Sequence, residues 1–222
     1  MDTATVRHTN PTRHLSLSKG SGGFTLIELL VVTAILVIVT SLVLVNNNRF
    51  GGTVLLQNLA YDMALSVREA QVYGISVRSF GGQFDFGYGM HFTANSQTYV
   101  LFADVLEQNG LYDCPDPELP DSCERVESTD LQRSYRIVKL CVPAGISMDA
   151  CVSNSGLWVA ELDILFRRPE PDACISADDA VKIDADGECT QNPEESARVV
   201  LESPRGDQRS FTVEATGQIS VE

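Results

Sequence analysis

Histidine and closely spaced cysteine pairs are scarce in this sequence. Three of its 222 residues are histidines, and two of these, His8 and His14, lie within the first 23 residues. No Cys-x-x-Cys pair occurs anywhere in the chain. Zinc sites usually draw their ligands from such residues. The composition therefore disfavours a transition-metal site, and no cofactor is expected.

Basic residues are also few. The chain holds 16 Lys and Arg against 30 Asp and Glu, a formal net charge of -14. The first 23 residues carry +2, from Arg7, Arg13 and Lys19 against Asp2, so the remainder carries -14 minus +2, or about -16. A surface this acidic repels phosphate backbones. Nucleic acid is therefore not expected as a partner.

Motifs of enzyme active sites are missing as well. We find no nucleophile elbow, phosphate-binding loop or histidine-containing metal motif. His91, the one histidine after residue 23, lies in an alternating aromatic stretch, where a surface or half-buried structural position is usual. The sequence therefore predicts that the protein is not an enzyme.

One acidic stretch permits an alternative. Asp184, Asp186 and Glu188 lie close together, and calcium takes several carboxylate oxygens. An EF-hand does not fit, because Gly187 at the sixth place of the loop puts Lys182 at the first. A solvated acidic loop is the favoured interpretation, with these three residues as weak calcium candidates.

A single long apolar run, Phe24–Val45, stands near the start of the chain, with Glu28 as its only charge. Its 22 positions span about 33 Å as a helix, enough for a bilayer core of about 30 Å. Small and basic residues precede the run, whereas a secretory signal has its small-residue cleavage site after the apolar core. The pattern predicts one membrane helix, with residues 1–23 in the cytoplasm and the carboxyl end outside.

Glu28 is the unusual residue of this run. A carboxylate inside a spanning helix costs about 2.5–3.5 kcal/mol and normally marks a function. The alternative is a side chain near the end of the span that reaches the headgroups. The string from Lys19 to Val32, KGSGGFTLIELLVV, closely resembles the processing motif of type IV prepilins and type II secretion pseudopilins.

The resemblance implies specific roles for three residues. Prepilin peptidase would cut between Gly23 and Phe24, and Phe24 would become the N-methylated first residue. Glu28 would be the fifth residue of the mature chain, where its carboxylate pairs with the terminal amine of a neighbouring subunit and sets the register between subunits.

The same resemblance implies a structural subunit, a pilin or minor pseudopilin, assembled through its amino-terminal helix. It would sit in the cytoplasmic membrane as a single-pass protein and then enter a filament. Its partners would be other pilin or pseudopilin subunits, the peptidase and an inner-membrane assembly platform. The alternative is a filament-tip subunit that binds a secreted substrate, a surface or DNA. The sequence leaves open whether a pilus, a secretion system or a competence system is served.

Beyond the apolar run the sequence predicts a helix followed by strands. Asn46–Gly52 is polar and holds two glycines, so we expect the helix to loosen or break there. Helical spacing of apolar residues then resumes from Leu56 to Ala70, which indicates a second helix or the second half of a long one. Predicted strands are Phe84–Phe92, Thr98–Ala103, Tyr135–Val142, Leu157–Phe166, Val199–Glu202, Ser210–Glu214 and Gln218–Val221.

These elements predict an α+β, type IV pilin-like fold, in which a long amino-terminal hydrophobic helix packs on an antiparallel sheet. The expected divisions are a leader (1–23), a transmembrane or filament-core helix (24–45), an amphipathic helix (46–79) and an extracytoplasmic β-rich head (80–222). Ser66–Gln71 and the ending Arg209–Val221 resemble the corresponding parts of H-type minor pseudopilins.

All six cysteines follow the apolar run, in the portion predicted to leave the cytoplasm, so they are expected to form disulfides. Fifteen pairings are possible in principle. We favour the pairs of sequence neighbours, which close loops in regions without clear strands, Tyr112–Asp130 and Pro169–Ser196 among them. These pairs are Cys114 with Cys123, Cys141 with Cys151, and Cys174 with Cys189.

Overall fold

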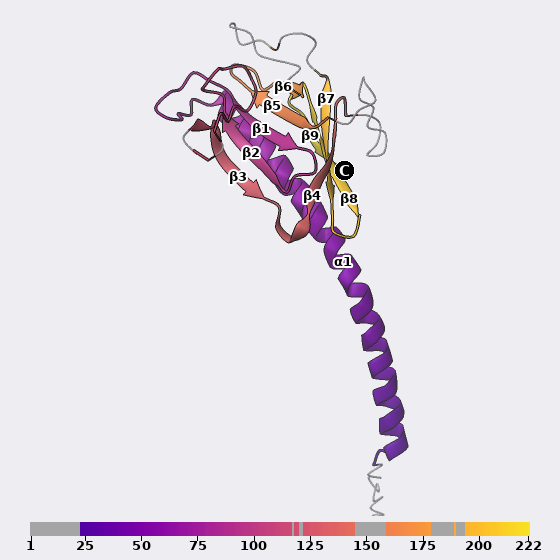
Figure 1. Ribbon diagram of the computed structural model, residues 1–222. Helices are drawn as coiled ribbons and strands as arrows, with labels where there is room; N and C mark the ends of the chain where they lie inside the picture. Colours follow the sequence, from indigo (N-terminus) through magenta and orange to yellow (C-terminus); the bar gives the residue numbers. More distant parts are fainter. Residues whose placement is uncertain (1–22, 117, 120–121, 145–158, 179–188, 190–193) are drawn as a thin grey trace, which may run out of the picture. The chain divides into compact units, whose positions relative to one another are not determined.

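A computed structural model describes residues 23–116, 118–119, 122–144, 159–178, 189 and 194–222. The chain divides into two compact units, Met1–Asn46 and Asn47–Glu222. The second unit is called the head below. Within the head, the carboxyl-terminal part of helix α1 (Leu26–Ile75) lies against the strands (Figure 1).

Helix α1 (Leu26–Ile75) is continuous over 50 residues. The segment after Gly52 is therefore the second half of one long helix, and an interruption at Asn46–Gly52, the other outcome that we considered, is wrong. A glycine inside a helix costs only about 1 kcal/mol relative to alanine. Extending an existing helix is far easier than starting a new one. Helix on both sides of the polar stretch is thus enough to carry the helix through it.

The described residues of the head form two antiparallel sheets. The five-stranded sheet has the order β3-β2-β1-β5-β6, and the four-stranded sheet has the order β4-β7-β8-β9. The strands of the first sheet are β1 (Tyr88–Thr93), β2 (Thr98–Ala103), β3 (Arg125–Asp130), β5 (Glu161–Phe166) and β6 (Ala173–Ala177). Those of the second are β4 (Arg136–Cys141), β7 (Ser196–Glu202), β8 (Gln208–Glu214) and β9 (Ile219–Val221). A short 3₁₀ helix, η2 (Gln132–Ser134), precedes β4.

The predicted fold class is confirmed, since a long apolar helix continues into a segment packed on antiparallel sheets. The prediction did not give the number of sheets, and the described strands divide into two. Strands β3 and β6 lie in regions where we expected none. β3 is a mostly exposed, polar edge strand, and β6 is short and built largely of small residues, so neither shows the alternation that marks a half-buried strand.

One face of α1 fills the space between the two sheets. Leu56, Ala60, Met63, Val67 and Ala70 are each fully buried. They belong to one apolar cluster with residues of β1 and β5 from the first sheet and of β4, β7 and β8 from the second. Each fully buried large side chain stabilises the fold by about 1.5–3 kcal/mol relative to exposure. Helical spacing in the sequence correctly predicted this face.

A buried amide ties α1 to both sheets. The Gln71 side chain is 3% exposed, and its Nε2 donates to the carbonyl oxygens of Pro171 (2.7 Å) and Gly217 (3.1 Å). Pro171 precedes β6 and Gly217 precedes β9. One side chain therefore satisfies two carbonyl groups from loops that belong to different sheets, which fixes the helix against each of them.

We predict that Gly74→Ala destabilises the head although alanine is the better helix former. A Cβ at Gly74 would collide with the backbone carbonyl of Phe166 on β5, and backbone cannot swing aside. Such overpacking costs about 1–3 kcal/mol. Gly52 in the same helix is the control, since a Cβ there meets only the Arg205 guanidinium, at 3.8 Å. Urea denaturation should show a loss for Gly74→Ala and no loss for Gly52→Ala, whereas equal effects would contradict the close approach.

Candidate functional site

The predicted processing bond lies just before α1. Residues 23–25 are in neither helix nor strand, and α1 begins at Leu26. The Phe24 side chain is 83% exposed, and nothing lies within 4 Å of the position where a Cβ on Gly23 would be. The bond between Gly23 and Phe24 is therefore outside the helical hydrogen-bond ladder.

Thr25 and Glu28 form the helix start. The Thr25 Oγ1 accepts a hydrogen bond from the Glu28 backbone N–H at 3.2 Å, which makes Thr25 the N-cap. Glu28 lies in the first turn, where a carboxylate interacts favourably with the positive end of the helix dipole. The sequence signal for this cap is Thr-x-x-Glu before an apolar run. Glu28 thus has a local role at the helix start in addition to any role between subunits.

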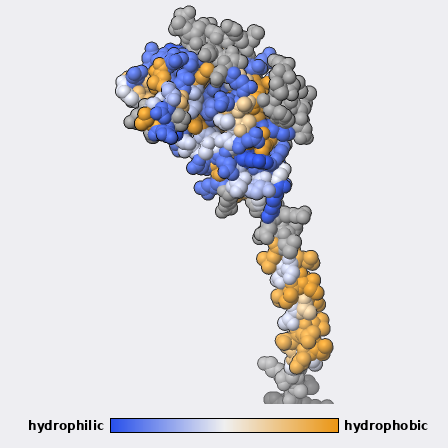
Figure 2. Space-filling view, viewed as in Figure 1, coloured by the Kyte–Doolittle hydropathy of each residue, from blue (hydrophilic) through white to orange (hydrophobic). Residues whose placement is uncertain are grey.

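The apolar part of α1 is exposed along its length. Leu26–Leu44 is long and apolar enough to cross a membrane, with 19 residues and a mean hydropathy of 2.8. None of this window is buried in the structure, and Figure 2 shows its surface as mainly hydrophobic. Nineteen helical residues span about 28 Å, close to the thickness of a bilayer core. The exposed surface suits a lipid or protein environment in place of water.

Hydroxyl groups in this segment are satisfied within the helix. Thr33 Oγ1 donates to the Leu30 carbonyl at 3.0 Å, and Thr40 Oγ1 donates to the Leu36 carbonyl at 2.7 Å. Ser41 Oγ donates to a carbonyl of α1 at 2.7 Å in the same way. These bonds leave the three polar side chains compatible with an apolar surrounding.

Two disulfides are present among the described residues of the head. Cys114 is joined to Cys123, and Cys174 is joined to Cys189, as pairing between sequence neighbours predicts. Cys141 is also disulfide-bonded. Its expected partner Cys151 lies outside the described residues, so that pairing stays a prediction.

A pair of buried carboxylates, which the sequence did not reveal, holds the loop between β2 and β3. Asp104 and Glu124 are both fully buried. The oxygens of Glu124 accept three backbone N–H groups, from Val105 (2.7 Å), Leu106 (2.6 Å) and Asp113 (3.0 Å). Burial raises the pKa of Glu124, and these three donors oppose the rise. Glu124 thus organises the loop that the Cys114–Cys123 disulfide closes.

Asp104 is less well satisfied. Its Oδ2 accepts the Gly110 backbone N–H at 3.1 Å, whereas its buried Oδ1 has no hydrogen-bond partner among the described residues. Burial, followed by the nearby Glu124 charge, raises the pKa of Asp104 to about 7. The folded head therefore binds a proton at Asp104 more tightly than the unfolded chain does.

This pKa predicts the sign of a pH effect. The folded pKa of Asp104 is above its unfolded value, so the protonated carboxyl favours the folded state. This contribution to the free energy of unfolding is fully present below about pH 4 and is lost as pH rises through about 7. Asp104→Asn should raise the free energy of unfolding at pH 8, by on the order of 1–4 kcal/mol, and flatten its fall between pH 5 and 8. Urea denaturation of the mature protein at both pH values measures this. The control Asp172→Asn, at an exposed residue, should leave the free energy of unfolding unchanged at both pH values. If Asp104→Asn kept the wild-type dependence of this free energy on pH, the prediction would be contradicted.

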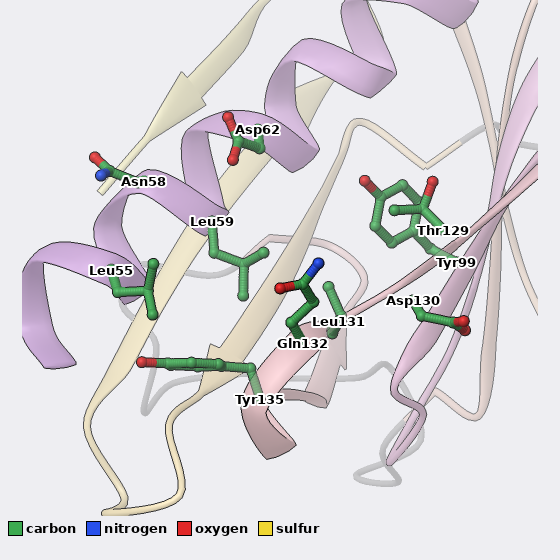
Figure 3. Close-up of a pocket in the computed structure, with 10 residues that line it drawn as sticks. All are labelled: Leu55, Asn58, Leu59, Asp62, Tyr99, Thr129, Asp130, Leu131, Gln132 and Tyr135. Carbon is green, nitrogen blue, oxygen red and sulfur yellow. The ribbon is translucent and has the colours of Figure 1, made fainter.

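A pocket of about 340 Å³ lies within the head between α1 and the end of β3 (Figure 3). Its lining comes from α1 (Leu55, Asn58, Leu59, Asp62), β2 (Tyr99), β3 (Thr129, Asp130) and the chain that follows (Leu131, Gln132, Tyr135). The Tyr99 hydroxyl shares a hydrogen bond with Ser66 Oγ at 3.2 Å, and the Tyr135 hydroxyl donates to the Gly52 carbonyl at 3.4 Å. These bonds hold both rings in place.

His91 is engaged within the five-stranded sheet. Its Nδ1 lies 2.8 Å from Asp163 Oδ1 on β5, and its Nε2 lies 3.2 Å from Thr93 Oγ1. The Tyr112 ring lies against the imidazole, with 5.0 Å between ring centroids. These contacts give His91 a half-buried structural position.

The described residues contain no group of three or more His, Cys, Asp or Glu side chains placed to hold a metal ion. The calcium candidates Asp184, Asp186 and Glu188 lie outside the described residues, so that alternative stays a prediction.

Comparison with known proteins yields one match, at the amino-terminal segment. Residues 18–44 match the prokaryotic N-terminal methylation motif. This range contains Gly23, Phe24 and Glu28 together with the exposed apolar window of α1. No curated protein and no solved structure matches the chain.

Proposed function

We propose that the chain is a structural subunit of a type IV pilus or of a type II secretion-type filament. The observation that carries the proposal is the match of residues 18–44 to the methylation motif, on a helix whose apolar window is fully exposed. Residues 1–23 are a leader, prepilin peptidase cuts between Gly23 and Phe24, and the new amino terminus of Phe24 is methylated. The subunit then assembles through α1.

The local geometry supports cleavage at this bond. A protease needs its substrate backbone free of helical hydrogen bonds, and the bond between Gly23 and Phe24 lies before the helix start at Leu26. Thr25, the N-cap of α1, lies on the carboxyl side of the cleaved bond, so the helix keeps its cap when the leader is removed. Processing thus leaves a folded helix with a free amino group one residue before its N-cap.

The distribution of charge and cysteine supports the proposed location. The leader is basic, which favours its retention in the cytoplasm. The head contains disulfides, which persist in oxidising compartments outside the cytoplasm. Together with one membrane-length segment, these features support a single-pass protein of the cytoplasmic membrane whose head is extracytoplasmic.

Glu28 supplies the assembly step. The amino group of Phe24 and the Glu28 carboxylate are charges at an apolar surface, and each is stabilised there by a partner of opposite sign. The pair forms between the terminus of one subunit and the carboxylate of its neighbour. Because this contact is short and specific, it fixes the stagger between adjacent helices.

Processing and assembly are tested together by fractionation. Epitope-tagged protein is expressed in cells with and without prepilin peptidase, and sheared filaments are separated from membranes. We expect the shorter form in the sheared fraction of peptidase-positive cells only. Uncleaved protein in filaments of peptidase-negative cells would overturn the proposal.

A filament-tip binding subunit is the second candidate, and the pocket between α1 and β3 favours it. The resemblance of Ser66–Gln71 and Arg209–Val221 to H-type minor pseudopilins supports a minor subunit in the same way. Abundance discriminates between the candidates, since a major subunit dominates the sheared fraction and a tip subunit is scarce in it.

A further inference from the structure

The pocket between α1 and β3 combines apolar walls with an acidic rim. Leu59, Tyr99 and Tyr135 supply apolar surface, and Asp62 and Asp130 carry the charges. Figure 3 shows Asp62 on the helix and Asp130 on the strand side of the cavity. The volume of about 340 Å³ is near the lower end of the range for ligand pockets. A cavity of this size takes one or two side chains.

The rim carboxylates are not engaged by the head itself. In the described part of the chain, no ion pair or hydrogen bond involves the side chain of Asp62 or Asp130, and both residues are exposed. By contrast, Glu202 pairs with Arg136 at 2.8 Å. An occupant that covers the two aspartates removes their water, which is unfavourable unless it brings positive charge. The rim therefore selects a cationic occupant and rejects an acidic one.

An open sheet edge lies beside the pocket. β3 is an end strand of the five-stranded sheet and pairs only with β2 among the described strands. Within the described residues, no backbone hydrogen bond reaches its other edge. Such an edge accepts an extended segment of polypeptide, whose side chains then fill adjacent pockets. The edge therefore favours a polypeptide occupant over a free amine.

We propose that this pocket and the edge of β3 bind an extended segment of a different protein, in which a lysine or arginine neighbours an apolar residue. A basic side chain of the segment lies at the rim beside Asp62 or Asp130, and the apolar side chain lies against Leu59 and Tyr135. Because the chain after residue 23 carries about -16, a basic segment is supplied more readily by another protein than by a second copy. The proposal goes beyond filament assembly and rests on the head alone.

Site-specific photo-crosslinking in cells tests the proposal with the full chain. The exposed residue Gln132 on the pocket wall is replaced by p-benzoylphenylalanine, and the crosslinked peptide is mapped by mass spectrometry. We expect a segment of another protein with a basic residue beside an apolar one. The double substitution D62N/D130N should lower the crosslink yield by about tenfold. The control E170Q/D172N, which changes two exposed acids between β5 and β6, should leave the yield unchanged.

Three results would overturn the proposal. The first is a crosslink yield at position 132 no higher than the yield with the photoprobe at Asp172. The second is a crosslink to a second copy or to a segment without a basic residue, and the third is a crosslink yield that D62N/D130N does not change. Filaments sheared from the same cells report assembly separately. Loss of the crosslink with normal filaments, or the reverse, therefore distinguishes failure of this proposal from failure of the filament role.

Discussion

Gly23→Val is expected to abolish removal of the leader, so that the protein stays at full length in the membrane. A branched side chain immediately before the bond restricts the backbone to fewer conformations and crowds the groups that the peptidase must hold. Nothing lies within 4 Å of the added Cβ, so the substitution leaves the contacts of the folded protein unchanged. Immunoblotting should show only the longer form.

Gly20→Val is the matched control, because it places the same side chain in the leader three residues before the proposed site. It should be cleaved at least partly, and its shorter form should match the wild type in mass. Normal cleavage of Gly23→Val would place the processing site elsewhere.

Glu28→Leu is expected to be inserted and cleaved but to be nearly absent from filaments. Removing a charge from the apolar helix favours insertion by about 2.5–3.5 kcal/mol. The cut between Gly23 and Phe24 lies four residues earlier and remains available. The terminal amine of a neighbour, however, loses its partner, and the stagger between subunits is no longer fixed. Comparing the membrane and sheared-filament fractions measures the effect.

Two further variants separate pairing between subunits from the helix start. Thr25→Val removes the hydroxyl that caps α1 and keeps the Glu28 carboxylate, at a cost to the helix of about 1 kcal/mol. Glu28→Gln keeps the size of the side chain and removes its charge. We expect Thr25→Val to assemble and Glu28→Gln to fail. Normal incorporation of either Glu28 variant would contradict the pairing role.

Helix α1 and the motif at its start could be predicted from the sequence because their signals are local. An apolar run of membrane length, the residues around Gly23 and the helical spacing after Leu56 each depend on neighbours a few positions away. The strand Thr98–Ala103 was predicted with its observed bounds for the same reason, since this mainly apolar run directly follows the predicted turn Thr93–Gln97. An interruption at Asn46–Gly52 did not form because local glycine preference was outweighed by helix cooperativity.

The features of the head depend on contacts that sequence patterns do not record. Asp104 and Glu124 are 20 positions apart in the chain and meet only when β2 and β3 pair. The pocket joins Leu59 of α1 to Tyr135, which follows β3. The burial of Asp104 could not be predicted, because the chain is rich in acidic residues and the neighbours of Asp104 in the sequence do not indicate a buried position. β3 escaped detection because an edge strand with polar residues lacks an apolar face.

The mass of the mature protein tests the central claim most directly. The protein is extracted from membranes of cells that contain active prepilin peptidase, reduced, and analysed intact and after digestion by mass spectrometry. We predict a chain that begins at Phe24 and carries one methyl group on its terminal amine. A protein that retains Met1, or one that begins at any residue other than Phe24, would contradict the account.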